Sequence, residues 1–351
     1  MRTCEELKIA VYGAGAMGTV LGAFLTKGGL NNVHLITRNK AHVDGLNKRG
    51  ATIVCEAENT EEVISVKAFT PSQILEKYDV VFLMTKQRAN KEILEFLLPY
   101  LEEDAIVCTT QNGLPEESVA NVVGKNRTYG GVASFGATFL GEGKVALTSK
   151  IDGMRMQICG YENGNEKIQT LFNVLSYVGK GTGNSEFVKV TDNLQGARWS
   201  KLAINSAFSG LSVVTGNTFG KIAKQRKSRK IALGVLRECI AVAGAQGVTL
   251  EKMQGYDMEK FLGGKTLFSR FVAYLLLPFA MKKHKKLLSG MLKDVQNSRR
   301  CEIDYIDGVV VKKGKEVGVP TPLCEKIVEI SHGIEDGLYE ISPKNLDFFE
   351  L

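Results

Sequence analysis

Lys201 and Asn205 interrupt a segment that is otherwise apolar, GARWSKLAINSAFSG at residues 196–210. The spacing of the apolar residues predicts a helix, and residues four apart share one face of a helix. An ammonium group can stabilise negative charge that develops on a reacting oxygen, and it can also supply a proton. A lysine in such a helix can instead extend its amine into solvent while its stem packs on the core. Other motifs in the chain have to decide between these interpretations.

A glycine-rich stretch, VYGAGAMGTVLG at residues 11–22, has the GxGxxG spacing. It follows a strand predicted at 8–13 and opens a helix predicted at 16–27, which is the context of dinucleotide binding. The first glycine permits the tight turn, the second lets a pyrophosphate approach the backbone, and the third allows the helix to pack on the strand. The N-terminus of the helix attracts the phosphates. The contacts expected in this loop are Gly13, Ala14, Gly15, Ala16, Met17 and Gly18.

The end of the next predicted strand, residues 32–37, indicates which dinucleotide binds. The sequence LITRNK places Arg38 and Lys40 there and contains no acidic residue. An Asp or Glu at this point would bind the ribose 2′-hydroxyl of NAD and repel a 2′-phosphate. A guanidinium group can bind a phosphate with two hydrogen bonds and stack on adenine. We therefore expect NADP(H), with Arg38 as a contact; the alternative is an ordinary surface arginine.

Two further strand ends place polar side chains at the same edge of the predicted sheet. Lys86 follows the strand predicted at 78–85, and Asn112 lies in the polar turn that ends the strand predicted at 104–113. Ligands of open α/β sheets bind outside the carboxyl ends of the strands. Each residue alone could be an ordinary loop residue, but together with the glycine loop they form a ring of polar groups around a nicotinamide.

The order of strands and helices predicts two domains in the 351 residues. Strands alternate with helices in the first half, which indicates an α/β fold with a parallel, doubly wound sheet. Helical periodicity dominates afterwards. We expect a cofactor-binding domain over 1–184 and an all-helical substrate and catalytic domain over 185–351, with a ligand cleft at their junction. Further strands are expected near 128–133, 144–148 and 154–159, strands or a hairpin over 52–69, and helices at 189–213, 219–246, 251–262, 266–285, 287–317 and 322–338.

The composition is that of a globular protein, with 44% apolar and 24% charged residues and a formal charge of +7. This charge fits a small anionic ligand. Seven cysteines without CxxC spacing favour a reducing cytoplasm over a disulfide framework, and no metal site is expected. A strand begins almost at the N-terminus, so we expect no signal peptide.

Two segments offer alternative partners. The apolar run 271–281 is too short to span a bilayer, but with the basic residues 282–286 it could contact a membrane interface. A buried helix with a solvated basic end is the favoured interpretation. The basic runs 221–230 and 282–286 could contact nucleic acid, yet they lack interleaved aromatic residues for base stacking. We expect neither a membrane nor a nucleic-acid partner.

Over nearly its whole length the chain resembles the ketopantoate reductases (2-dehydropantoate 2-reductases). The matching stretches are GAGAMG, TKQ, QNGLPEE, ASFGATFLGEGKV, ARWSKLAINSAFSGLS and GMLKDVQNSRRCEIDYIDGVVVKKGKEVGVPTP. The resemblance implies an N-terminal Rossmann-type domain, a C-terminal helical domain, and NADPH-dependent reduction of 2-dehydropantoate to pantoate in pantothenate biosynthesis.

The resemblance also implies roles for individual residues. Lys201 corresponds to the general acid that protonates the reduced carbonyl oxygen, and Glu302 to a glutamate near the cofactor and that lysine. Cofactor contacts are implied on the glycine loop and at Lys86, Asn112, Ala137 and Glu302. Substrate contacts are implied at Asn112, Lys201, Asn205 and Ser209.

Three positions depart from the family pattern. Ser209 and Phe219 stand where substrate-binding asparagines are common, and Gly290, preceded by Ser289, stands where a serine helps to hold the substrate carboxylate. The resemblance therefore indicates the class of reaction more clearly than it indicates the substrate. A reductase of another keto acid or ketone and a non-catalytic NADP-binding sensor are the alternatives, and a homodimer is one of the assemblies left open.

Overall fold

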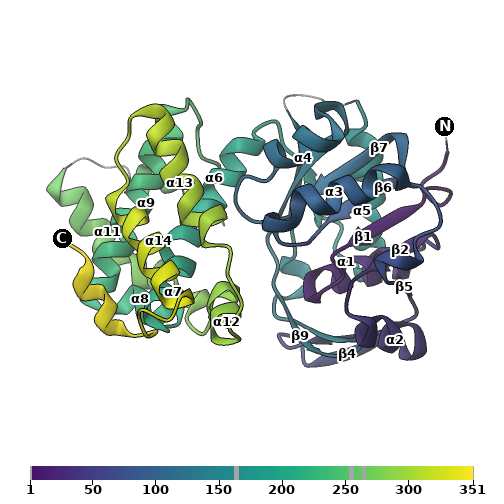
Figure 1. The fold of residues 1–351 in the computed structure, drawn as a ribbon, viewed down its shortest axis with the longest axis horizontal. Coiled ribbons are helices and arrows are strands. Elements are labelled where there is room, and N and C mark those ends of the chain that lie inside the picture. Colours follow the sequence, from purple (N-terminus) through teal and green to yellow (C-terminus); the bar gives the residue numbers. More distant parts are fainter. Residues whose placement is uncertain (1, 162–165, 253–256, 263–265, 351) are drawn as a thin grey trace. The chain divides into compact units, whose positions relative to one another are not determined.

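The computed structural model describes residues 2–161, 166–252, 257–262 and 266–350. The chain divides into two compact units, and each is described by itself (Figure 1). The first unit comprises Met1–Gln111 and Pro115–Leu194, and the second comprises Asn112–Leu114 and Gln195–Leu351.

The first unit is built on an eight-stranded sheet in the order β12-β11-β8-β7-β6-β1-β2-β5. In this order, every neighbouring pair from β8 through β7, β6, β1 and β2 to β5 is parallel. β11 is antiparallel to β8, and β12 is parallel to β11. The order reverses at β1, which pairs with β2 on one side and β6 on the other, so the topological switch point lies between β1 and β6. The bounds are β1 Ile9–Tyr12, β2 Val33–Ile36, β5 Lys67–Phe69, β6 Tyr78–Leu83, β7 Leu101–Thr109, β8 Thr128–Ala133, β11 Met156–Gly160 and β12 Val188–Val190.

Helices cover both faces of this sheet because its central strands are apolar on both faces. In β1, Ile9 and Val11 pack in a core with α1 and α5, whereas Ala10 and Tyr12 pack in a second core with α3 and α4. The doubly wound α/β arrangement predicted from the continuous apolar strands is confirmed. The helices are α1 Ala16–Lys27, α2 Lys40–Arg49, α3 Asn90–Leu97, α4 Glu116–Val123 and α5 Ile168–Thr182.

A smaller sheet of four strands, in the order β4-β3-β10-β9, belongs to the same unit. The strands are β3 Ala51–Cys55, β4 Thr60–Ile64, β9 Ala137–Gly141 and β10 Lys144–Leu147. The pairs β3–β4 and β9–β10 are antiparallel, and β10 joins them by pairing in parallel with β3. The predicted strands over 52–69 are therefore a hairpin of the small sheet followed by β5 of the large one.

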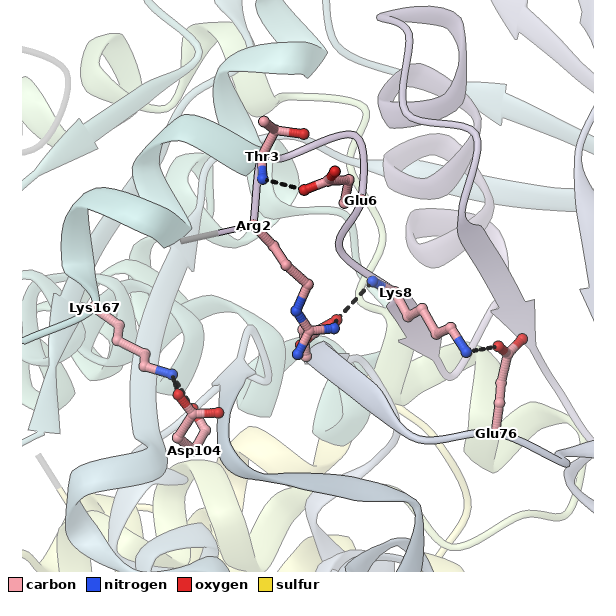
Figure 2. Close-up of polar contacts among 8 residues, drawn as sticks. Arg2, Thr3, Glu6, Lys8, Glu76, Asp104 and Lys167 are labelled. Atoms are coloured by element: carbon pink, nitrogen blue, oxygen red, sulfur yellow. Dashed lines mark hydrogen bonds and ion pairs between the residues drawn. The ribbon is translucent and has the colours of Figure 1, made fainter.

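Ion pairs gather at the amino ends of the central strands (Figure 2). Asp79, near the start of β6, accepts a hydrogen bond of 2.9 Å from the backbone N–H of Lys8, just before β1. It also pairs with the guanidinium of Arg2 at 2.7 Å, and the amine of Lys8 pairs with Glu76. These contacts stabilise the edge opposite the carboxyl ends, where ligands of such sheets bind.

The second unit is helical throughout its described part. Its core contains Trp199 and Phe208 and the apolar faces of α9, α13 and α14, which pack against one another (Figure 1). The bounds are α6 Leu194–Ile204, a π-helical segment Asn205–Gly210, α7 Leu211–Thr215, α8 Phe219–Lys224, α9 Arg226–Ala245, α10 Met258–Leu262, α11 Leu267–Ala280, α12 Gly290–Gln296, α13 Ile303–Val317 and α14 Pro322–Glu335.

The structure differs from the expected boundaries in several places. The helix expected at 219–246 is two helices, α8 and α9, with Gln225 between them. The first unit continues to Leu194, ten residues beyond the expected 184, because β12 pairs with β11 and extends the large sheet. The helix expected at 287–317 is two helices, since Ser298 adopts a left-handed conformation (φ 53°) between α12 and α13. Part of the helix expected at 251–262 lies outside the described residues, and β9 and β12 were not expected.

The expectation of a buried helix at 271–281 is wrong for one face of α11. Ala273, Leu277 and Met281 are buried, but five large apolar residues of the helix are exposed. Among the described residues, no other element packs over these five side chains closely enough to bury them. The exposed residues are Phe268, Phe271, Leu275, Leu276 and Phe279.

Candidate functional site

The glycine loop of the first unit has the geometry that its sequence predicts. Gly13 has a φ of 103°, and a Cβ there would lie 2.6 Å from the backbone of Met84 and of Thr85 at the end of β6. A Cβ on Gly18 would lie 2.6 Å from the carbonyl oxygen of Gly13, so α1 approaches the loop closely. At Gly15 the nearest atom would be 4.0 Å away. The first and third glycines are thus required by the fold, whereas the second leaves space above the backbone.

The N-terminus of α1 faces this space with unsatisfied backbone donors. Gly15 is the N-cap, no side chain caps the helix, and its first turn contains no acidic residue. The first N–H groups of an α-helix have no partner within the helix. Together with the positive end of the helix dipole, they form a site for a phosphate group.

Arg38 and Lys40 are exposed between β2 and α2. Asn39 between them caps α2, and its side chain accepts a hydrogen bond from the N–H of His42. Arg38 lies near the end of β1, where its charge opposes the rise that burial causes in the pKa of Tyr12. Among the described side chains, no carboxylate forms an ion pair with Arg38. The guanidinium is therefore placed at the carboxyl edge of the sheet, beside the strand that leads into the glycine loop.

A buried amide pair joins the ends of β6 and β7. Asn90 and Gln111 exchange two hydrogen bonds between their side chains, of 3.1 and 2.6 Å, and Gln111 also donates to the carbonyl of Thr85 at 2.8 Å. These contacts fix the turn that contains Lys86, which is partly buried. Sequence analysis missed both amides, because a pairing across 21 residues leaves no local pattern.

The remaining predicted cofactor contacts lie on three different elements. Ala137 begins β9, which contacts α1. Asn112 follows Gln111, is exposed, and belongs to the second unit with the two residues after it. Glu302 is the N-cap residue of α13, also in the second unit, and is partly buried. Contact of these residues with a dinucleotide stays a prediction.

Lys201 lies in the last turn of α6 and is partly buried. Burial, with a smaller contribution from the nearby charge of Arg198, lowers the pKa of its amine to about 7. The next turn of the helix toward the N-terminus is anchored in the core by Trp199, which is fully buried. A lysine with such a pKa is half protonated near neutral pH, which suits a group that donates a proton. Its pairing with Glu302 stays a prediction.

The predicted substrate residues lie on the π-helical segment that follows Lys201. The segment begins at Asn205 and ends at Gly210, so the α-helical spacing assumed for Lys201 and Asn205 ends at Ile204. Asn205 and Ser209 are partly exposed, as is Lys201, whereas the rest of the segment faces the core. Single π-helical turns occur frequently at functional sites. The buried residues are Ser206, Ala207, Phe208 and Gly210.

The other two departures from the family pattern differ in their surroundings. Phe219 is buried and packs on Phe208 with ring centroids 5.5 Å apart, so it supports the π segment from inside the core. Gly290 is exposed, and a Cβ there would meet nothing within 4 Å. The hydroxyl of the preceding Ser289 caps α12 by accepting from the N–H of Met291. The Ser289 hydroxyl is therefore used to cap α12.

Within the described part of the chain, no group of three or more His, Cys, Asp or Glu side chains is arranged to hold a metal ion. The same residues include no helix with the length and apolarity needed to cross a membrane.

Family models match both units. The model described as Ketopantoate reductase PanE/ApbA matches residues 9–157, and the model of its C-terminal domain matches residues 193–335.

Curated relatives match along almost their full length. A 2-dehydropantoate 2-reductase of Lactococcus lactis is 27% identical over 335 residues, covering 94% of this chain and 98% of the relative. One from Pyrococcus horikoshii is 28% identical over 322 residues, covering 90% of this chain and 94% of the relative.

Solved structures share the fold at lower identity. D-mandelate dehydrogenase with NADH and anilino(oxo)acetate superposes with a TM-score of 0.79 at 24% identity, covering 95% of this chain and 99% of that one. A ketopantoate reductase of Ralstonia eutropha gives 0.77 at 24% identity, with coverage of 95% and 99%. A ketopantoate reductase of Staphylococcus aureus, described as dimeric, gives 0.72 at 17% identity, with coverage of 95% and 100%.

Proposed function

The chain belongs to the ketopantoate reductase family, and from this premise we propose that it reduces a small anionic 2-oxo acid to the 2-hydroxy acid with NADPH. As a member of this family it is an oxidoreductase of the 2-dehydropantoate 2-reductase type. The first candidate substrate is 2-dehydropantoate itself, which gives pantoate and places the enzyme in pantothenate biosynthesis.

The proposed reaction depends on the lowered pKa of Lys201 and on its place before the π segment. Its amine has a pKa of about 7 and precedes the π segment with Asn205 and Ser209. As a carbonyl is reduced, negative charge develops on its oxygen, and an ammonium group stabilises that charge and donates the proton. Asn205 and Ser209 supply an amide and a hydroxyl for binding the substrate. The proposed role of Glu302 is to balance the charge of the ammonium group and to contact the cofactor.

Bound NADPH would supply the hydride. Residues of the first unit would bind its phosphate groups. The proposed contacts are the backbone of the glycine loop for the pyrophosphate, and Arg38 with Lys40 for the 2′-phosphate. The space at Gly15 and the uncapped N-terminus of α1 support the former. NADH is the alternative, because the solved D-mandelate dehydrogenase binds NADH on the same fold. The remaining proposed cofactor contacts are Lys86 and Ala137 of the first unit, and Asn112 and Glu302 of the second.

A different 2-oxo acid is the second candidate substrate. Ser209 replaces a larger amide, Phe219 is part of the core, and Gly290 lacks the hydroxyl expected there. These changes remove polar groups that would hold 2-dehydropantoate. Mandelate, the 2-hydroxy acid in the name of the structurally similar D-mandelate dehydrogenase, bears a phenyl group, so aryl 2-oxo acids belong in a comparison panel.

An NADPH-oxidation assay over a panel of 2-oxo acids tests the function. We expect turnover with one member, and in Lys201→Ala a loss of about 10²–10⁴-fold, the usual range for general acid catalysis. NADPH affinity should be unchanged in the variant, which separates a catalytic defect from misfolding. Near-wild-type turnover in Lys201→Ala would exclude the lysine as proton donor, and wild-type inactivity on every member would favour the NADP-binding sensor.

Gly290→Ser tests the choice of substrate. The open space at this position accommodates the side chain, so the fold should be unaffected. If 2-dehydropantoate is the substrate, the added hydroxyl should lower the KM for 2-dehydropantoate in the variant. An unchanged KM, together with faster turnover of another 2-oxo acid than of 2-dehydropantoate, favours the second candidate.

We also propose a homodimer formed through the exposed face of α11, in a cytoplasmic protein. Five large apolar residues on a single helix are more than a monomer ordinarily leaves exposed, and the same patch on two copies is self-complementary. Sedimentation velocity should give a dimer for the wild type and a monomer for Phe268→Ser with Phe271→Ser. Leu338→Ser, which removes an equally exposed apolar residue elsewhere, is the control.

A further inference from the structure

The core of the second unit contains a carboxyl group without a hydrogen-bond partner. Asp307, in the second turn of α13, is fully buried, and neither of its oxygens has a partner among the described residues. A buried carboxylate that is neither paired nor hydrogen-bonded costs several kcal/mol, and such a group takes up a proton instead. The surroundings of Asp307 therefore favour a neutral carboxylic acid.

The titratable groups around Asp307 add to this preference. Cys239 and Glu238 face it from α9, and Cys324 from α14; the thiols of Cys239 and Cys324 are hydrogen-bonded to each other. The π segment contributes no titratable side chain. Burial raises the pKa of Glu238, and hydrogen bonds of 2.9 Å that its carboxylate accepts from the N–H groups of Leu323 and Cys324, at the N-terminus of α14, oppose this rise. Burial first, then Cys239 and Glu238, raises the pKa of Asp307 well above its usual range.

Asp307 packs directly under the end of the π segment. A Cβ on Gly210 would lie 2.7 Å from Oδ2 of Asp307 and 2.7 Å from Cγ2 of Ile327 on α14. Any larger residue at this position would force either these two side chains or the backbone to shift. The position of the carboxyl group therefore limits where Gly210, and with it Ser209, can lie.

We propose that Asp307, held as an uncharged carboxylic acid, is the positioning residue that fixes the π segment so that Asn205 and Ser209 are presented to the 2-oxo acid. This role rests on the proposed function, but Asp307 itself is buried and acts through Gly210. Ionisation would demand solvation of the carboxylate, and because Asp307 is fully buried against Gly210, we expect the segment to move when water reaches it.

A substrate-independent measurement tests the protonation state. The folded-state pKa is raised, so Asp307 contributes stability that is present at low pH and is lost as pH rises toward that pKa. Asp307→Asn has the same shape and cannot ionise. We expect its Tm to increase relative to the wild type by more than about 2 °C between pH 5 and pH 9. Asp336→Asn, an exposed carboxylate that pairs with Arg300, is the matched control and should show a constant difference from pH 6 to pH 9. A constant difference for Asp307→Asn would overturn the proposal.

Hydrogen exchange of the peptide that contains residues 205–210 tests the positioning role without a substrate. At pH 9 we expect faster exchange of these amides in the wild type than in Asp307→Asn, with equal exchange in both proteins at pH 6. Equal exchange at both values would show that ionisation does not reach the π segment.

Kinetics then connect the segment to binding. Asp307→Asn should retain the KM for the keto acid at pH 7, whereas Gly210→Ala should raise it about tenfold or more with a smaller change in kcat, because the added methyl group displaces the segment. If Asp307→Asn is as impaired as Gly210→Ala at every pH, Asp307 acts as a charged group and the proposal fails. If the wild type reduces no 2-oxo acid, the proposed function fails, and the Tm and exchange results still decide whether Asp307 fixes the segment.

Discussion

Lys201 shows how a single residue can have its chemistry changed by its position. An exposed lysine holds its proton far above neutral pH, but burial in α6 lowers the pKa of this amine to about 7. Its type and spacing were visible in the sequence; its altered pKa was not, because the burial that lowers it depends on how the folded chain packs around the amine.

The pH dependence of reduction follows from this pKa. If Lys201 donates the proton, kcat/KM should be constant below pH 7 and fall by about tenfold per pH unit well above it, since the deprotonated amine has no proton to give. Steady-state rates from pH 5.5 to 9 measure this, with NADPH affinity followed in parallel as a control. A rate that stays constant to pH 9 contradicts the role.

Arg38 is the residue whose replacement should change cofactor preference. In Arg38→Asp, a charged hydrogen bond to the 2′-phosphate is lost and a repulsive charge is introduced. We expect NADPH binding to weaken by roughly 1.5–3 kcal/mol, with much less effect on NADH. Fluorescence titration of both cofactors measures the difference, and Lys91→Asp, at an exposed position on α3, controls for net charge. An equal loss for both cofactors would assign Arg38 no part in selectivity.

At the scale of elements, the glycines of the loop have two different roles: Gly13 is required by the fold, and Gly15 leaves space for the cofactor. Gly13→Ala should destabilise the protein by about 1–3 kcal/mol, because the residue needs a positive φ and its Cβ would overlap the end of β6. Gly15→Ala should leave Tm within about 2 °C and weaken NADPH binding, since the methyl group projects into the space where the pyrophosphate would lie. Thermal unfolding and NADPH titration on both variants test the contrast. A large loss of Tm in Gly15→Ala would mean that the space is part of the fold.

The elements also differ in how far they could be predicted. The helix α1 was predicted at about its observed bounds, because a strand, three glycines and an apolar face all indicate the same helix. The π segment could not be predicted, since the apolar spacing across Ile204 fits an α-helix equally well. Its cause is tertiary: Gly210 fits between Asp307 and Ile327, and Phe208 packs on Phe219.

For the whole molecule, the sequence predicted two domains and missed where the chain passes between them. Short strands such as β9 and β12 gain their stability from pairing partners distant in sequence, as β12 does from β11, so local patterns do not define them. The division of roles, with the cofactor held by the first unit and the substrate by the second, stays a prediction.

The assignment of Asn112–Leu114 to the second unit has a consequence for dissecting the protein. These three residues are separated in sequence from the rest of that unit by 80 residues, and Leu114 packs against its core. A fragment that begins at residue 195 would therefore lack both a piece of its own core and a predicted ligand contact. We expect it to be less soluble than a fusion in which residues 112–114 are joined directly ahead of residue 195, and recovery in the soluble fraction after expression compares the two. The helical half is discontinuous in sequence, so a cut at the start of α6 separates it from three of its own residues.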